Sequence, residues 1–309
     1  MKNHPRIAFV AIAAGLVITF YSVSGVSQQA PAGTKPVAGQ TNMTSTVDRI
    51  YVLDGGVGHS GDASSWSNNI DPPGTPIDIS APCHLIKHGD TWVMFDTCPN
   101  DIIASMPNGY GTSANGIRWV KSKTMASQLT QLGLKPDDIK YIALSHNHAD
   151  HSGNVYQFPN SVVLIQKAEY DQAFSEGRAP AGPPNFAGQV FPRQQPVKLL
   201  DGDYDVFGDG SMVLFFVGGH TRGQMVALVR LKNTGPILLS GDAVHTQANW
   251  DNRRTPRIQG SNEENEWAIT VQVAYQRIAD LLSFYKAQLW IHHDVEQYKK
   301  MKYAPDFYD

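Results

Sequence analysis

Four metal-binding side chains lie within six residues of one another: His146, His148, Asp150 and His151. They come directly after the apolar run 141–144, which predicts that they sit at the end of a buried strand. Neutral imidazoles and carboxylates this close together are the ligands that zinc and similar divalent metals prefer. A solvated polar loop is the alternative interpretation, but such a loop does not need three imidazoles. The cluster therefore predicts part of a metal site.

Three more candidate ligands lie far away in the sequence but in the same kind of position. His220, Asp242 and His293 each come at or just after the end of a short apolar run that is predicted to be a strand. Side chains at the carboxyl ends of neighbouring strands converge on one crevice in layered α/β folds. Taken alone, His220 would be a surface histidine and Asp242 a turn former. Because all of the candidates share this position, we expect one site.

The periodicity of the chain predicts an α/β sandwich that forms one catalytic domain over about 47–309. Strands are expected at 47–53, 84–87, 92–96, 139–144, 161–165, 211–217, 224–231, 237–239 and 289–291. Helices are expected at 124–132, at 167–174 and from a capping box at 261–264 through about 286. The long helix has a predicted buried stripe of Trp267, Val271, Ala274, Ile278 and Leu281.

Three segments carry few signals for regular structure. The segment from the end of the first expected strand to about 76 is expected to be a Gly/Ser/Asn-rich loop. The segment 99–123 is expected to be an irregular insertion or lid. The Pro/Gly-rich segment 177–196 is expected to be a binding loop or a mobile lid.

The first 27 residues have the form of a secretory signal peptide. Lys2 and Arg6 precede the apolar run 7–21, and cleavage is expected after Ser27. An uncleaved signal-anchor is the alternative, although the apolar run is short for a bilayer span. Residues 28–46 are rich in Ala, Pro, Gly and Thr and are expected to form a flexible linker. The predicted location is therefore the periplasm or the outside of a bacterial cell.

Composition narrows the classes of partner. The 309 residues include 17% charged side chains and carry a net charge of −3. Removing the signal peptide leaves 23 basic against 28 acidic residues, a net charge of −5. Nothing here predicts nucleic-acid binding or a polybasic membrane patch. The oligomeric state is not determined by the sequence, and a homodimer is one of the states it permits.

The two cysteines flank the predicted hairpin. Cys83 and Cys98 should lie near each other across two strands, so one disulfide is compatible with an oxidising compartment. A disulfide demands a narrow Cβ geometry, and two buried free thiols are the favoured alternative.

These patterns together resemble the metallo-β-lactamase superfamily over essentially all of 47–309. Within it, the closest similarity is to the N-acyl-homoserine lactone lactonases, the quorum-quenching branch. The matching segments are 82–87 (Pro-Cys-His-Leu-Ile-Lys), 95–97 (Phe-Asp-Thr), 145–154, 219–224 (Gly-His-Thr-Arg-Gly-Gln), 240–243 (Ser-Gly-Asp-Ala) and 293–297 (His-Asp-Val-Glu-Gln). The resemblance implies a sandwich of two central sheets flanked by helices.

The resemblance also implies a site with two zinc ions, although other divalent metals are an alternative. The first zinc would be held by His146, His148 and His220. The second would be held by Asp150, His151 and His293, with Asp242 bridging both. In the pair His292–His293, the family pattern aligns His293, so His292 is expected to be a neighbour rather than a ligand.

Lactone hydrolysis follows from such a site. A hydroxide shared by two zinc ions stays deprotonated near neutral pH and would attack the lactone carbonyl. Asp150 is the candidate that passes a proton to the leaving ring oxygen, or it is a ligand only. Lactonases of this branch carry a tyrosine three residues after the bridging aspartate, where this chain has His245. We expect His245 to donate a hydrogen bond to the substrate in its place; simple packing is the alternative.

Acyl-chain contacts are expected from the insertion and the Pro/Gly-rich loop, through Trp119, Phe186 and Phe191. Rival functions keep the same metals but act on other lactones, thioesters or phosphotriesters. A metal-binding protein without catalysis is a further alternative, but all seven candidate ligands are present.

Overall fold

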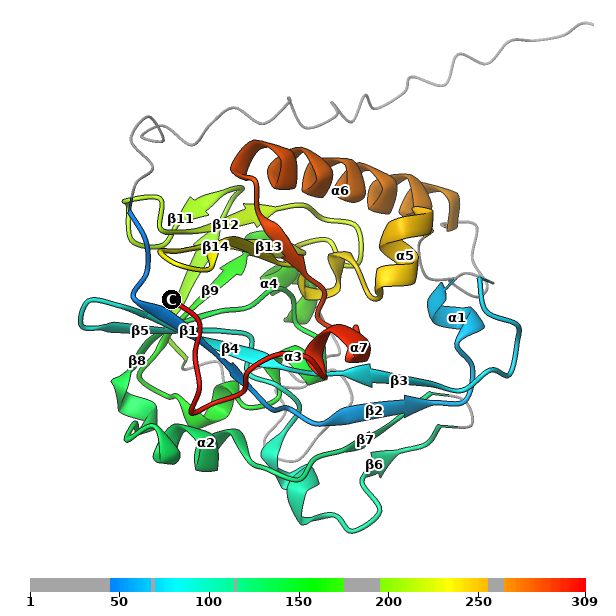
Figure 1. Ribbon diagram of the computed structural model, residues 1–309, viewed down its shortest axis with the longest axis horizontal. Helices are drawn as coiled ribbons and strands as arrows, with labels where there is room; N and C mark the ends of the chain where they lie inside the picture. The colour runs from blue at the N-terminus through cyan, green and yellow to red at the C-terminus, as the bar shows by residue number, and fades with distance from the viewer. Residues whose placement is uncertain (1–44, 68–69, 114–115, 175–194, 255–263) are drawn as a thin grey trace, which may run out of the picture. The chain divides into compact units, whose positions relative to one another are not determined.

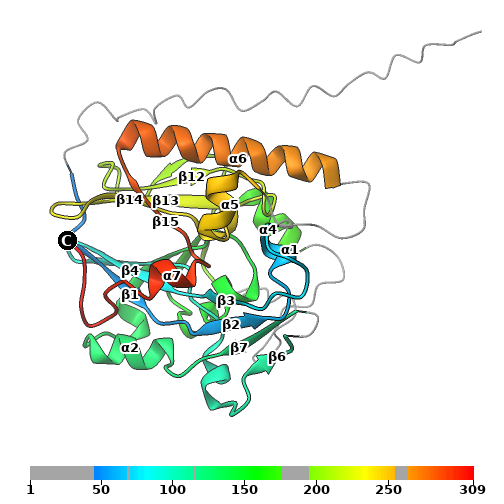
Figure 2. The ribbon, with the colours of Figure 1, turned by 45° about the vertical axis from the view of Figure 1, so that its right-hand side comes forward.

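The computed structural model describes residues 45–67, 70–113, 116–174, 195–254 and 264–309, all within the compact unit Pro36–Asp309. Two sheets pack face to face, with α6 (Glu264–Tyr285) on the outer side of one sheet and α2 (Met125–Gln131) on the outer side of the other (Figure 1). Figure 2 shows the same layers after a turn of the molecule. The predicted sandwich of two central sheets flanked by helices is confirmed.

The first sheet has six strands in the order β1-β4-β5-β8-β9-β10. Their bounds are β1 (Arg49–Leu53), β4 (Cys83–His88), β5 (Thr91–Phe95), β8 (Ile139–Ala143), β9 (Val162–Gln166) and β10 (Val197–Leu200). The first three strands pair antiparallel and the last four pair in parallel. Parallel pairs need crossover connections, which here contain α2 and α4 (Lys167–Ala173).

The second sheet has five strands in the order β11-β12-β13-β14-β15. Their bounds are β11 (Tyr204–Asp205), β12 (Met212–Phe216), β13 (Met225–Leu231), β14 (Gly235–Leu239) and β15 (Gln288–Trp290). β13 runs antiparallel to both of its neighbours, and β15 runs parallel to β14. The strands β12, β14 and β15 therefore end at the same edge of the sheet.

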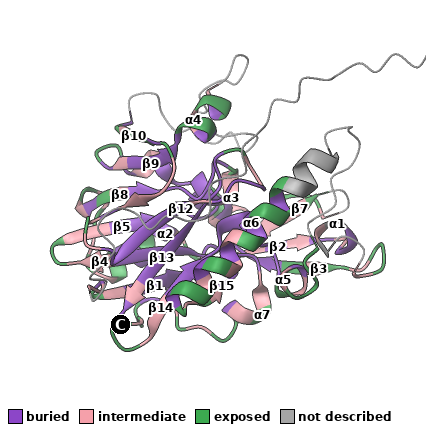
Figure 3. Ribbon diagram, turned by 90° about the horizontal axis from the view of Figure 1, so that it is seen from above, coloured by how far each residue is buried: buried purple, intermediate pink, exposed green. Residues whose placement is uncertain are grey.

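The core lies between and outside the two sheets. Residues such as Phe95 and Leu164 of the first sheet and Leu214 and Ala227 of the second belong to one buried cluster. Two further clusters lie under the flanking helices, and Figure 3 shows the central strands buried while α6 exposes its outer face. Apolar residues on both faces of these strands are what a sheet covered on both sides requires. The predicted buried stripe of α6 is confirmed from Val271 to Leu281, and the side chain of Trp267 lies outside the described part.

A third sheet, β3-β2-β7-β6, corrects two predicted loops. The bounds of its strands are β2 (Val57–Ser60), β3 (Ile77–Ser80), β6 (Tyr110–Gly111) and β7 (Ile117–Val120). The segment up to 76 also contains α1 (Ser64–Ser67), and the insertion at 99–123 also contains the 3-10 helix η2 (Asp101–Ser105). These strands have at most four residues, and the pairing of β2 with β7, which builds the sheet from both segments, joins Val57 to Val120, so local periodicity could not reveal them.

The remaining elements are short. They are the helices α3 (Ala149–Ser152), α5 (Gln247–Asn252) and α7 (Val295–Tyr298) and the 3-10 turns η3 (Pro136–Asp138), η4 (Val155–Gln157) and η5 (Gly241–Ala243). The predicted loop 177–196 and the capping box at 261–264 lie almost entirely outside the described residues. Among the described residues, no helix combines the length and apolar character that a membrane crossing requires.

Cys83 and Cys98 form a disulfide, with their Cα atoms 5.1 Å apart, so the favoured pair of free thiols is wrong. Both cysteines are fully buried. Asp96 and Cys98 both have φ in the left-handed region, at 59° and 58°. This turn after β5 brings Cys98 back to the start of β4, a reversal that the sequence spacing alone does not determine.

Candidate metal centre

The structure brings all seven predicted ligands to one place at the ends of strands. His146 and His148 follow β8, and α3 carries the next two. The others follow strands of the second sheet: His220 after β12, Asp242 after β14 and His293 after β15. The backbone N–H of Met225 donates to the carbonyl oxygen of Ser145 at 2.8 Å, which joins the two sheets at this edge.

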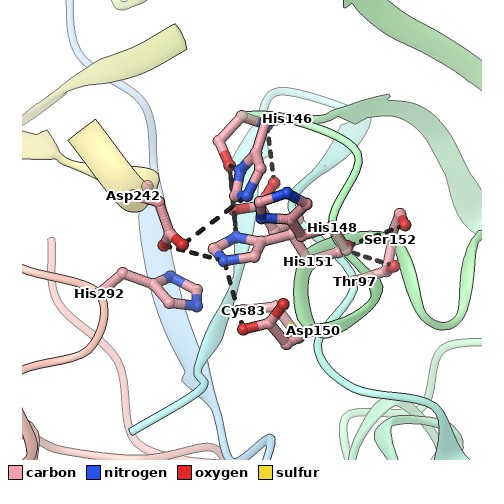
Figure 4. Close-up of polar contacts among 12 residues, drawn as sticks. Cys83, Thr97, His146, His148, Asp150, His151, Ser152, Asp242 and His292 are labelled. Atoms are coloured by element: carbon pink, nitrogen blue, oxygen red, sulfur yellow. Dashed lines mark hydrogen bonds and ion pairs between the residues drawn. The ribbon is translucent and has the colours of Figure 1, made fainter. Parts of the chain in front are cut away.

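Asp242 lies at the centre of the cluster, where Figure 4 shows it pointing toward the imidazoles. Its Oδ1 is 3.0 Å from His151 Nε2 and 3.1 Å from His293 Nε2. Its Oδ2 is 3.3 Å from His220 Nε2 and 3.7 Å from His146 Nε2. One carboxylate therefore faces two different groups of imidazoles with two different oxygens.

The side chains form two ligand sets around Asp242. The first ligand set is His146, His148 and His220, whose ligand atoms lie with one Asp242 oxygen within 4.8 Å of one another. The second ligand set is Asp150, His151 and His293. In the second set, Asp150 Oδ2 is 3.5 Å from His293 Nε2 and 3.7 Å from His151 Nε2.

Buried polar atoms without partners make the sets suited to cations. His146 Nε2, His151 Nε2 and Asp242 Oδ1 are buried and have no well-oriented hydrogen-bond partner outside the cluster. Buried polar atoms in native proteins are normally paired, and lone pairs that converge in this way are satisfied by a metal ion. The donor set of imidazole and carboxylate fits zinc and similar divalent metals.

Electrostatics distinguish the members of the sets. Burial lowers the pKa of His146 and His220 well below the ordinary histidine value, so these rings are neutral. Burial would also lower the pKa of His151, but the carboxylates of Asp242, Asp150 and Asp96 outweigh it and raise the pKa well above its ordinary value. A cation that enters here must therefore displace a proton.

A second layer of hydrogen bonds holds the second ligand set. Asp96, at the end of β5, is fully buried and has its Oδ2 2.8 Å from His151 Nδ1. The same carboxylate accepts from the backbone N–H of Ser145 at 2.7 Å. His293 Nδ1 lies 2.7 Å from the carbonyl oxygen of Ser80. Such contacts fix the orientation of a ligand ring. The role of Asp96 was missed, although its position at a strand end could have indicated it.

Local sequence explains two of the loops that carry ligands. Asp294 caps α7 by accepting from Gln297 N at 2.8 Å, and Gln297 Oε1 accepts from Ile291 N at 2.7 Å. These contacts close the turn around His293. Before Asp242, Gly241 has φ 49°, and a Cβ there would lie 2.6 Å from Ser145 Cβ. Only glycine allows this approach.

His292 lies within reach of the second ligand set. One nitrogen each of His151, His292 and His293 lie within 4.8 Å of one another, and the His292 side chain is buried. Its ring is stacked on that of His151, with centroids 4.2 Å apart and 28° between the planes. Ring nitrogens bind a metal in the plane of the ring, so stacked rings do not converge well on one ion. We therefore keep His292 as a neighbour; Figure 4 shows its ring beside Asp242 and His151.

Aromatic side chains border the cluster. His245 Nε2 is 3.5 Å from Asp242 Oδ2, and the ring is buried. The ring centroid of Trp66 in α1 is 5.5 Å from that of His245, and the Trp119 centroid is 6.3 Å from that of His293. Trp66 was missed because its segment was predicted to be a loop. The predicted contacts Phe186 and Phe191 lie outside the described residues.

An αββα sandwich with two ligand sets at one edge defines the class of metal-dependent hydrolases with the metallo-β-lactamase fold. A family model described as the metallo-beta-lactamase superfamily matches residues 76–271. The N-acyl homoserine lactonase AttM of Rhizobium radiobacter is 30% identical over 248 residues, which cover 76% of this chain and 89% of that protein. An N-acyl homoserine lactonase of Bacillus sp. is 26% identical over 270 residues, which cover 85% and 99%.

Solved structures agree on the fold. An N-acyl homoserine lactone hydrolase with the product N-hexanoyl-L-homoserine at its catalytic metal center has a TM-score of 0.71 and 23% identity, covering 85% of this chain and 100% of that one. AidC, a dizinc quorum-quenching lactonase, has a TM-score of 0.54 and 18% identity, covering 86% and 97%. The chain belongs to the metallo-beta-lactamase superfamily and, within it, to the N-acyl homoserine lactonases.

Proposed function

We propose that this protein is a dinuclear zinc hydrolase that opens the lactone ring of N-acyl homoserine lactones, a quorum-quenching activity. The observation that carries the proposal is the position of Asp242, whose two oxygens face two separate ligand sets. Relatives named as N-acyl homoserine lactonases support the choice of substrate.

The ligand sets would each hold one zinc ion, with Asp242 shared between them. When bound, the two ions supply a nucleophile at neutral pH and polarise the carbonyl group. The rest of the reaction depends on side chains that orient the lactone and move protons.

Asp150 is suited to the proton transfer. Hydrolysis adds water across the ester bond, so the carbonyl–oxygen bond of the ring breaks and the leaving oxygen takes up a proton. The Asp150 side chain keeps 16% of its surface exposed and has its Oδ2 beside His151 and His293. It can therefore pass a proton from the attacking water to the leaving oxygen.

His245 is suited to hold the lactone carbonyl. Its ring lies beside His220, with centroids 4.8 Å apart, and its Nδ1 is buried without a hydrogen-bond partner. The ring can donate one hydrogen bond to the substrate carbonyl oxygen. The variants His245→Phe and His245→Tyr separate shape from hydrogen bonding because they differ only in a hydroxyl. We expect kcat/KM to fall about 10²-fold in the Phe variant and to recover partly in the Tyr variant. An unchanged kcat/KM in both His245→Ala and His245→Phe would exclude this role.

The acyl chain would lie against Trp66 and Trp119, which border the second ligand set with apolar ring faces. Phe186 and Phe191 stay predicted contacts. Replacing either tryptophan by alanine should weaken the binding of long-chain substrates more than that of short-chain ones. The ratio of the KM values for the two kinds of substrate measures this difference.

Export through the signal peptide is part of the proposal. The disulfide between Cys83 and Cys98 supports it, since such bonds persist in oxidising compartments. Expression in a bacterium, fractionation and mass determination should give a periplasmic or secreted protein that lacks the first 27 residues. A full-length protein in the cytoplasm would contradict export.

Ring opening by the purified, metal-analysed protein tests the function. Acid release should be followed with short- and long-chain N-acyl homoserine lactones, with a paraoxon-type phosphotriester and a thioester as controls. We expect two equivalents of zinc and turnover of the lactones. Turnover of a control substrate alone would assign the site to another hydrolase of the same fold.

A further inference from the structure

Glu169 is a buried carboxylate that the proposed reaction does not use. It lies in the first turn of α4 and is only 4% exposed. A buried carboxylate is costly unless hydrogen bonds or a cation stabilise it. Among the described residues, its stabilising contacts are with backbone N–H groups, and no lysine or arginine forms an ion pair with it.

The two oxygens of Glu169 bind two different loops. Its Oε1 accepts from the backbone N–H of Asn147 at 2.9 Å, and Asn147 stands between His146 and His148. Its Oε2 accepts from the backbone N–H of Gly223 at 3.0 Å, three residues after His220. One side chain therefore ties together the loops that carry the whole first ligand set.

The contact with Gly223 is closely fitted. A Cβ at that position would lie 2.3 Å from Glu169 Cβ and 2.7 Å from Glu169 N. Any other residue would push α4 and the His220 loop apart. The glycine and the glutamate thus fix one distance between the loops.

The backbone hydrogen bond from Met225 N–H to the Ser145 carbonyl, at 2.8 Å, joins the strand ends beside these loops, and few contacts within the loops themselves fix this distance. Among the described residues, the other hydrogen-bond contact between segments 146–148 and 220–223 joins His220 Nε2 and His148 Nδ1 at 3.0 Å. Both residues belong to the predicted first ligand set, so a bound cation would compete with this contact. The Glu169 contacts use backbone groups and remain available.

We propose that Glu169 is a positioning residue that sets the affinity of the first ligand set for its metal ion, without touching metal or substrate. The inference rests on the assignment of His146, His148 and His220 to one ion in the proposed function. A carboxylate is required to keep both hydrogen bonds, because an amide would turn an N–H donor toward one of the two backbone N–H groups.

The variant Glu169→Gln tests this role with a nearly unchanged shape. Zinc content is measured after equilibrium dialysis against a graded chelator, and the absorption of the cobalt-substituted protein is recorded. We expect one metal equivalent to bind about 10- to 100-fold more weakly and the other to stay unchanged. Asp171→Asn is the matched control, since Asp171 lies on the exposed side of the same helix in an ion pair with Lys167. It should retain both equivalents.

A double-mutant cycle assigns the weakened equivalent. In a His220→Ala background the first ligand set is already incomplete, so Glu169→Gln should cause no further loss of metal affinity. In an Asp96→Asn background its effect should persist in full. If Glu169→Gln does not fold, Glu169→Asp keeps both acceptors at a shorter reach and should weaken the same equivalent to a smaller degree.

Three results would overturn the proposal. The Glu169→Gln variant could bind both metal equivalents as tightly as the unchanged protein, or it could bind both more weakly to the same degree. The unchanged protein could also bind fewer than two equivalents. These measurements do not use turnover. A protein that binds two zinc ions but leaves lactones intact would refute the proposed substrate and leave the role of Glu169 standing.

Discussion

The two ligand sets share Asp242 but are held by the protein in different ways. In the second set, the rings of His151 and His293 are buried, and each uses its other nitrogen to contact Asp96 or a backbone carbonyl. In the first set, His148 is exposed and its ring contacts that of His220. Apart from a 3.0 Å contact between His146 Nδ1 and the Ser145 hydroxyl, the first set is tied through its loops, whereas the second is tied through its rings.

For the two metal ions of the proposed function, this difference predicts different behaviour. A ring held by its own hydrogen bond keeps its orientation when the ion leaves, so the second set is preorganised. In the first set, His148 is exposed to water, and the buried His146 contacts the hydroxyl of Ser145 rather than a carboxylate or carbonyl. We expect the ion of the first set to exchange faster, and each variant below tests part of this contrast.

Asp242→Ala should have the largest effect, because it removes the one ligand that both sets share. Turnover of lactones should fall at least about 10³-fold, since the lost metal chemistry contributes several kcal/mol. Zinc analysis should find less than two equivalents. Full turnover in this variant would contradict a shared carboxylate.

Removing the disulfide with Cys83→Ser and Cys98→Ser should affect the second set most, because Cys98 follows Asp96 by two residues. The bond closes a loop with a sequence separation of 15, so the free energy of unfolding should fall by about 3 kcal/mol. Urea unfolding measures that loss, and zinc dialysis should find the second equivalent weakened. Equal weakening of both equivalents would argue against the contrast.

Asp96→Asn should weaken the second set more than the first, because its direct contact with a ligand ring is to His151. The amide can contact His151 Nδ1 but lacks the charge that strengthens the contact, so the affinity of one equivalent should fall about 10- to 100-fold. Competition with a zinc-binding dye measures both affinities. Loss at the first set instead would reverse the assignment of the two sets.

His84→Phe probes a buried histidine outside both sets. Burial lowers the pKa of His84 to about 3, and its Nε2 lies 3.0 Å from the Tyr298 hydroxyl. Because the folded pKa is below the unfolded value, this ring stabilises the protein fully above about pH 6.5, and stability falls as the pH drops toward 3.

The change in unfolding free energy between about pH 7.5 and 5.5 should therefore be about 1.4 kcal/mol smaller in the His84→Phe variant than in the unchanged protein. Comparing the two proteins at each pH cancels the common contribution of the metal ions. An equal change in both proteins would show that His84 does not stay neutral in the fold.

Strong local patterns made the sandwich and the ligand cluster predictable. The run 141–144 before His146 and the strands before His220 and Asp242 are apolar, and the metal-binding side chain that follows each of them indicated one crevice. The helix α2 was also predictable from local sequence, because Thr124 caps its start and Leu132 caps its end.

Other features depend on contacts that no local pattern records. β2 has only four residues, including Gly58, and is a strand because β3 and β7 pair with it. Glu169 lies on a helix that was predicted, but its role depends on the approach of Gly223 across the fold. The spacing of Cys83 and Cys98 permits a disulfide but favoured free thiols, and the left-handed turn after β5 brings the two sulfurs together.

The burial of the disulfide has a practical consequence for handling the protein. In the proposed zinc enzyme, thiol reductants would compete for the metal at once, because His148 is exposed to solvent. They reach Cys83 and Cys98 only when the surrounding core opens, because neither cysteine has exposed surface. Activity lost in reductant should therefore decay in two phases, of which added zinc restores only the fast one. Time courses, rather than single end points, distinguish metal loss from reduction.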